Sequence, residues 1–244
     1  MHRLIRNALM DGQYEPGERI RISTVASELG TSITPVREAI FRLVSEGALE
    51  LKAATSVQVP ILSVSQLREI QTVRILLEGV LTERAGEVIT ERQLSDLERI
   101  QEDFIAAAER DAKLASLHNR RFHFALMTIA AQPTIAGVVE NMWVMMGSLL
   151  KVFHDTVPQR ELSKDRHRHY DVLSALREGR PVAAREAMEA DIRWGMLLVE
   201  WLEEETRKRE AAEQSFVGRL SRKAEGSGKA PLPRSKAASA RLEV

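Results

Sequence analysis

The chain has 244 residues, enough for one or two domains, and 44% of them are hydrophobic, so it can bury a real core. The absence of cysteine excludes disulfide bonds, thiolate zinc sites and cysteine nucleophiles, and it suits a reducing cytoplasm. Because 35 basic residues balance 35 acidic ones, the composition does not favour a protein that coats nucleic acid over an extended surface.

The sequence predicts neither a membrane span nor an export signal. Its longest apolar stretch, Met142 to Phe153, is interrupted by Lys151 and is shorter than the ~20 residues that cross a bilayer. Arg3 and Arg6 interrupt the apolar N-terminal segment before it can form a secretory signal. We therefore expect no membrane partner and a cytoplasmic location.

The first 62 residues have the pattern of a winged helix-turn-helix. A helical stripe ends near residue 11, and residues 15–18 form a turn. Ser23 is the expected N-cap of a short helix that ends at Gly30 and carries three residues inward: Val25, Ala26 and Leu29. Ser32 is the expected N-cap of the next helix, whose predicted buried face comprises Val36, Ala39, Ile40 and Leu43. Residues 48–52 and 57–60 alternate like two strands of a hairpin.

The remainder of the chain is predicted to be helical. Residues 63–209 show helical periodicity with short breaks near residues 90, 111, 132–133, 157–158 and 179–181, which gives about six helices. Residues 210–244 form a basic tail, and we expect it to lack a fixed structure beyond about residue 215. The predicted fold class is therefore mostly α, with a winged helix-turn-helix followed by an all-α helical bundle.

The second helix of a helix-turn-helix places its N-terminal residues against base edges in the major groove. Ser32, Thr34, Pro35 and Arg37 occupy that end here, and Arg37 is the candidate for a bidentate contact to guanine. Arg42 and Lys52 are candidates for phosphate contacts. The segment by itself equally fits a helix whose charged face is merely solvated.

The helix-turn-helix resembles a known family. The run Ser32-Ile33-Thr34-Pro35-Val36-Arg37-Glu38-Ala39, together with Pro16-Gly17 and Glu46-Gly47, is similar to the DNA-binding domain of the GntR family of bacterial transcription regulators. The resemblance implies binding to a double-stranded DNA operator. The family usually has Arg where this chain has Ile33, so one expected DNA contact is absent. The family also usually has a Gly at the wing tip, and Ser56 stands near that place here.

Four polar residues of the helical region have the spacing of a metal site. Asn119 and His123 lie four residues apart, on one face of a helix. His169 and Asp191 lie on two later helices among apolar residues. Convergence of these four side chains in a bundle would create a mixed nitrogen and oxygen site for zinc, nickel or manganese. For any single histidine, a structural role is the more common one, and we expect surface positions for His118, His154 and His167.

The helical region also resembles a known domain. Arg74-Ile75-Leu76-Leu77-Glu78, Asn119-Arg120-Arg121-Phe122-His123 and the helix of His169 are similar to elements of the FCD (FadR C-terminal domain) effector domain of GntR regulators. The resemblance implies a metal held by Asn119, His123, His169 and Asp191, with Asp191 at a position where His is common. It also implies a small carboxylate effector, which Arg74 would bind unless Arg74 pairs with Glu78 instead.

These observations lead to one main functional prediction. We expect a non-enzymatic, ligand-responsive transcription regulator, a repressor, which forms a homodimer because two half-sites raise DNA affinity. The alternative is a metal-dependent enzyme that uses the same side chains, although no His-Glu-x-x-His base is present. A metal-free sensor of fatty acyl groups, found in one branch of the same family, is disfavoured by His123 and His169.

Overall fold

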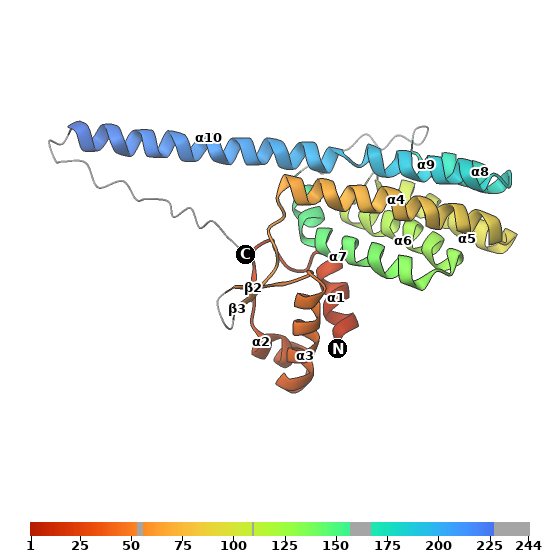
Figure 1. Ribbon diagram of the computed structural model, residues 1–244, viewed down its shortest axis with the longest axis horizontal. Helices are drawn as coiled ribbons and strands as arrows, with labels where there is room; N and C mark the ends of the chain where they lie inside the picture. Colours follow the sequence, from red (N-terminus) through yellow and green to blue (C-terminus); the bar gives the residue numbers. More distant parts are fainter. Residues whose placement is uncertain (53–55, 109, 157–166, 227–244) are drawn as a thin grey trace, which may run out of the picture. The chain divides into compact units, whose positions relative to one another are not determined.

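The computed structural model describes residues 1–52, 56–108, 110–156 and 167–226 of the chain (Figure 1). It divides into two compact units, residues 1–201 and residues 202–244. The first unit contains both the predicted winged helix-turn-helix and nearly all of the predicted helical bundle. The described residues are mostly helical with one small sheet, which confirms the predicted fold class.

The N-terminal part is a winged helix-turn-helix. Its helices are α1 (His2–Met10), α2 (Ile22–Glu28) and α3 (Ile33–Ser45). The predicted buried face of α3 is confirmed, because Val36, Ala39, Ile40 and Leu43 are all buried. The prediction for α2 was partly wrong. Its N-cap is Arg21 rather than Ser23, and Leu29 is 40% exposed because it follows the last helical residue instead of continuing the inward stripe.

The wing is a three-stranded antiparallel sheet with the order β1-β3-β2. Its strands are β1 (Arg19–Ile20), β2 (Glu50–Lys52) and β3 (Ser56–Gln58), with Val57 opposite both Ile20 and Leu51. The predicted hairpin therefore exists, although both of its strands are shorter than expected. Strand β1 was not predicted, because two residues are too few to show an alternating pattern.

Seven helices follow in the described residues. They are α4 (Val64–Val88), α5 (Glu91–Ala108), α6 (Ala112–Ala130), α7 (Pro133–Thr156), α8 (His169–Arg177), α9 (Pro181–Trp194) and α10 (Leu197–Gly226). A capping box starts α4, because Ser63 accepts from the backbone of Gln66 while the Gln66 side chain accepts from the backbone N–H of Ser63. The predicted breaks fall between helices, except that the one at residues 157–158 lies outside the described residues.

Helix α4 is the centre of the bundle and packs against α6, α7 and α9. The fully buried side chains around it include Leu67, Leu81, Phe122, Leu126 and Met188. Residues Pro133–Phe153 of α7 are long and apolar enough to cross a membrane by length and composition, but a core helix of a globular protein has the same properties. Several α7 side chains, among them Val139, Trp143 and Met146, are buried within the fold, as in such a core helix.

The expectation for the C-terminal tail was wrong for residues 215–226, because helix α10 continues to Gly226. The segment 202–225 contains Glu, Lys, Arg and Ala, which favour helix, and it has no Pro. Ion pairs at i,i+3 spacing, Glu204–Arg207 and Glu205–Lys208, add local support. Residues 227–244 of the predicted tail lie outside the described residues.

Within the first unit, the winged helix-turn-helix packs against α7 through α1 (Figure 1). Gly147 makes this packing possible, because a Cβ there would overlap the carbonyl oxygen of Leu9 and lie 2.7 Å from Cα of Met10. Polar contacts flank this contact along α7: Arg6 pairs with Glu140 at 2.8 Å, and the Asn141 amide donates to the carbonyl of Glu46 at 2.6 Å. The predicted boundary at residue 62 remains a prediction, since both parts lie in one unit.

Candidate DNA-reading helix and metal centre

The N-terminal end of α3 presents most of the predicted DNA-reading side chains to solvent. Ser32 is the N-cap residue, with extended backbone angles and no side-chain capping bond, so its hydroxyl is available for other contacts. Thr34 and Arg37 are exposed, whereas Pro35 is half-buried in the first turn. Exposure is necessary for DNA contact but does not establish it, so these roles remain predictions.

The two predicted phosphate-binding residues take part in exposed ion pairs. Nε of Arg42 lies 3.0 Å from Glu46, and Nζ of Lys52 lies 3.3 Å from Glu50. The Arg42 and Lys52 side chains are 68% and 59% exposed. Exposed pairs of this kind are worth only ~0–1 kcal/mol, so both cations can exchange their partners for a phosphate at little cost.

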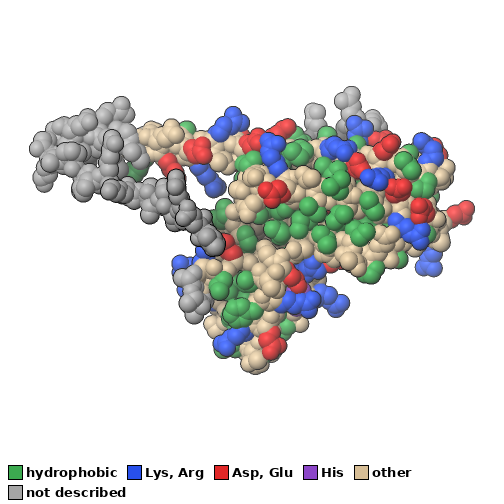
Figure 2. Space-filling view, in the orientation of Figure 1, with side chains coloured by type: hydrophobic (Ala, Val, Ile, Leu, Met, Phe, Trp, Pro, Cys, Tyr) green, Lys and Arg blue, Asp and Glu red, His purple; other side chains and the backbone are tan. Residues whose placement is uncertain are grey.

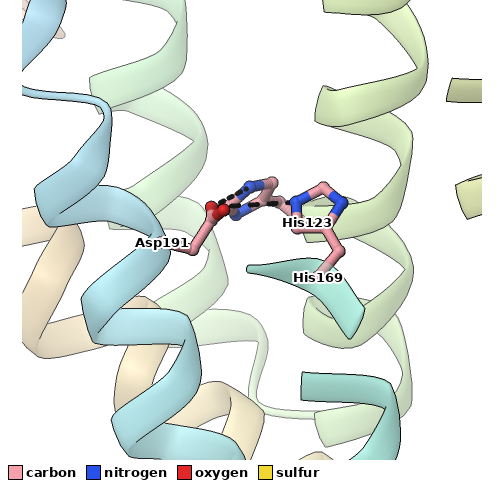
Figure 3. A group of neighbouring side chains, drawn as sticks. All are labelled: His123, His169 and Asp191. Carbon is pink, nitrogen blue, oxygen red and sulfur yellow. Dashed lines mark ion pairs between the residues drawn. The ribbon is translucent and has the colours of Figure 1, made fainter. Parts of the chain in front are cut away.

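Three of the four predicted metal ligands come together in the helical part: His123 from α6, His169 from α8 and Asp191 from α9 (Figure 3). One ligand atom from each residue lies within 4.8 Å of the others. Oδ2 of Asp191 lies 3.4 Å from Nε2 of His123 and 3.7 Å from Nε2 of His169. All three side chains are buried.

Each imidazole is oriented by an acceptor on another helix. Nδ1 of His123 lies 2.6 Å from Oε2 of Glu78 on α4, and because a carboxylate only accepts, Nδ1 carries the proton. Nδ1 of His169 likewise donates to the amide oxygen of Gln101 on α5, at 2.7 Å. Phe122 stacks on the His169 ring at a centroid distance of 3.9 Å. These contacts direct both Nε2 atoms toward Asp191, as acceptors behind the histidine ligands do in metal sites.

The pKa values of the two histidines in the cluster are shifted in opposite directions. Burial disfavours a charged His123, but the Glu78 and Asp191 carboxylates raise its pKa to about 9. Burial holds the pKa of His169 well below its usual value, so this ring is neutral. Although burial favours the neutral acid, the neighbouring imidazoles keep the pKa of Asp191 below its usual range. The cluster thus contains a carboxylate and a neutral imidazole that are ready to bind a metal, whereas His123 would have to release its Nε2 proton when the metal binds.

The donor set fits a divalent metal ion. Among the described residues, Nε2 of His169 is a buried nitrogen without a hydrogen-bond partner, an arrangement that is costly unless another group binds there. Two imidazoles and a carboxylate are ligands that zinc, nickel and manganese accept. Asn119 lies one turn before His123 on α6 and is half-buried, and its membership of the ligand set remains a prediction.

Arg74 forms an internal ion pair with Glu78, which was the predicted alternative to effector binding by Arg74. Nε of Arg74 lies 2.6 Å from Oε1 of Glu78, and both side chains are buried. The Arg74 guanidinium also lies 4.1 Å from the ring centroid of Trp143, whose Nε1 donates to Glu78 at 3.2 Å. Arg74 therefore supports Glu78, and through it His123.

The sequence reasoning missed three residues around the cluster, Glu78, Gln101 and His167, and the burial of His118 elsewhere on α6. Glu78 was visible only as a partner of Arg74, and Gln101 gave no signal. His118 and His167, expected on the surface, are buried. The ring of His167 lies 4.3 Å from that of His169, and their i,i+2 spacing at a helix start was the available sign. The His154 side chain lies outside the described residues.

Comparison with known proteins identifies both parts of the chain. The family described as "Bacterial regulatory proteins, gntR family" matches residues 2–59, and the FCD domain family matches residues 69–193. The regulator McbR of Escherichia coli K12 is 33% identical over 174 residues, which cover 71% of this chain and 79% of McbR. A probable D-xylose utilization operon repressor of Paenarthrobacter nicotinovorans is 24% identical, over 74% of this chain and 78% of that protein.

The solved structures agree. The structure of E. coli McbR/YncC superposes with a TM-score of 0.76 at 29% identity and covers 82% of this chain and 95% of that one. These relatives are transcription regulators, which removes the alternative of a metal-dependent enzyme. With a winged helix-turn-helix followed by an FCD domain, the chain belongs to the GntR family of bacterial transcription regulators.

Proposed function

We propose that the protein is a cytoplasmic repressor that binds operator DNA as a homodimer and responds to a small carboxylate through a metal held in its FCD domain. The observation that carries the proposal is the buried cluster of His123, His169 and Asp191, in which one imidazole nitrogen lacks a partner among the described residues. An unpaired buried nitrogen costs free energy, and a metal bound at Nε2 of His169 would remove that cost.

His123, His169 and Asp191 would hold the metal, with Asn119 as the fourth ligand. A bound divalent ion would supply open coordination positions that attract a carboxylate. Glu78 and Gln101 keep the two rings fixed, which is the contribution of the protein itself. Because Arg74 is committed to Glu78, we now assign it to this support rather than to direct effector binding.

The homodimer is supported by exposed apolar side chains on the helical part. Leu76 on α4 is 53% exposed and Val138 on α7 is 44% exposed. Figure 2 shows hydrophobic side chains gathered over α4 and α7 on the face that it displays. Regulators of this type pair two recognition helices on one operator, so a twofold interface on the helical domain would serve DNA binding.

The metal content of the protein tests the proposal. Protein purified without chelator is analysed by inductively coupled plasma mass spectrometry, and we expect about one divalent ion per chain. The His123→Ala and His169→Ala variants should lose it. His118→Ala is the matched control, since His118 is also a buried histidine of α6 but lies outside the cluster.

Effector response is measured on the same proteins as the change in operator affinity caused by small carboxylates. The two cluster variants should bind DNA but lose the response, because α3 lies outside the cluster. Full metal content in the His123→Ala/His169→Ala double variant, or an unchanged response, would refute the proposal and leave only the DNA-binding function.

A further inference from the structure

A second site lies away from the metal cluster, between α1, α6 and α7. It is a half-open cavity of about 370 Å³, a volume typical of sites for small organic molecules. One wall belongs to the DNA-binding part and includes Met10 and Gln13. The others come from the FCD domain. The cavity therefore lies where a single small molecule would contact both parts of the regulator.

The walls of the cavity are largely apolar. Leu114, Leu117 and Leu150 line it together with Trp143. Leu114 stands out because 42% of its surface is exposed although it lies in the first turn of a helix that packs within the bundle. Apolar side chains that face an open cavity favour an apolar ligand body, which would bury them.

Some charged side chains of the cavity already have partners in the protein, whereas another is free to bind a ligand. Arg120 is committed to the carbonyl of Met10 and to the carboxylate of Asp11, and Asp111 caps α6 by accepting from the backbone of Leu114. Lys113 lies on the same wall, is exposed, and forms no ion pair with any residue that the structure describes. Lys151 also lines the cavity and pairs with Glu15. Among the described residues, Lys113 is thus the ammonium of this cavity that forms no ion pair.

The cavity is chemically separate from the metal cluster. His123, His169 and Asp191 do not line it. Trp143 lies between the two, because it borders the cavity while its Nε1 donates to Glu78, the partner of His123. A ligand in the cavity would therefore contact the support of the metal site without touching the metal ligands.

We propose that this cavity is a second ligand site, which binds an amphipathic organic anion with its aromatic or aliphatic body against Trp143 and Leu117 and its charge on Lys113. The site goes beyond the proposed function and does not depend on a metal. Met10 and Gln13 form one wall, so a bound ligand contacts both the DNA-binding part and the FCD domain and holds the two together.

The test uses 2-naphthoate as the probe and its uncharged analogue 2-naphthamide as the reference, with binding to the full chain measured by calorimetry and tryptophan quenching. We expect saturable binding of naphthoate with a Kd below about 1 mM. Lys113→Met should weaken naphthoate about threefold to tenfold and leave naphthamide unchanged, since only the charge contact is lost. Lys208→Met, on α10, is the matched control and should change neither.

Two further variants locate the binding. Ser116→Phe, which fills the cavity from α6, should weaken both compounds at least tenfold, whereas the His123→Ala/His169→Ala variant should bind naphthoate normally. Absence of saturable binding, or equal binding by wild type and Lys113→Met, would overturn the proposal. Loss of binding only in the double histidine variant would also overturn it and place the carboxylate at the metal. A metal-free wild-type protein, which would refute the proposed function, leaves this test intact.

Discussion

Glu78 lies 2.6 Å from His123 and so connects a side chain of the metal cluster to the buried Arg74, whose Nε lies 2.6 Å from the same carboxylate. The two contacts use different oxygens of Glu78. One carboxylate therefore compensates the only guanidinium of α4 that is buried in the described residues and also orients the ring of His123.

This relationship predicts that Glu78→Gln destabilises the fold. The variant leaves Arg74 buried without an anion, and removal of one partner from a buried pair costs ~3–5 kcal/mol. We expect that loss in the free energy of unfolding measured by urea denaturation, together with ~10–100-fold weaker metal binding. Glu87→Gln, which breaks the exposed pair with Arg84, is the control and should cost at most ~1 kcal/mol. Equal stability of the two variants would contradict the prediction.

A second prediction concerns DNA. Arg37→Ala should cost ~1–3 kcal/mol of discrimination at one base position of each half-site, because the exposed Arg37 at the start of α3 would face the major groove of a bound operator. Lys52→Ala should weaken all sequences similarly. Gel shifts on an operator selected from random DNA, and on single-base variants of it, distinguish the two effects. If Arg37→Ala kept the affinity and selectivity of the wild type, Arg37 would not be one of the residues that recognise bases.

A third prediction concerns the packing of α1 against α7. Gly147→Ala places a Cβ against the backbone of Leu9 and Met10, so we expect a loss of ~1–3 kcal/mol in the free energy of unfolding. Gly137→Ala is the matched control on the same helix. Nothing lies within 4 Å of a Cβ at Gly137, so that variant should gain ~0.5–1 kcal/mol from helix propensity. The prediction fails if both variants gain stability.

A fourth prediction concerns assembly. We expect a dimeric mass in light scattering at micromolar concentration, and Leu76→Glu should shift it toward the monomer by placing a charge in the proposed interface. Val182→Glu, at an equally exposed apolar position on α9, should leave the dimer intact. A monomeric wild type would rule out this interface.

Much of the fold was predictable because the sequence carries strong local signals. The buried face of α3 follows from helical periodicity, and the capping box at Ser63 begins α4 near the predicted start of the helical region. The two-residue strand β1 was not predictable, because it exists only through pairing with β3. The continuation of α10 was missed because charged residues and few apolar ones also occur in unstructured tails.

The metal cluster was predictable in part. His123, His169 and Asp191 were expected to converge from spacing and family resemblance, and the structure brings them together. Glu78 and Gln101 were not expected as partners of the imidazoles, because their roles depend on how α4 and α5 pack beside α6 and α8. Helix packing of this kind brings together residues far apart in the chain, and local periodicity carries no information about it.

Helix α7 contacts the DNA-binding part at two separate levels, through Asn141 and through Lys151, which pairs with Glu15. Lys151 lies ten positions after Asn141, which corresponds to ~15 Å along the helix. Contacts at two levels resist a tilt of the DNA-binding part more than one contact would, although the exposed Lys151–Glu15 pair adds only ~0–1 kcal/mol. Trp143 lies between these two levels, so one segment of α7 both borders the cavity and carries the DNA-binding part.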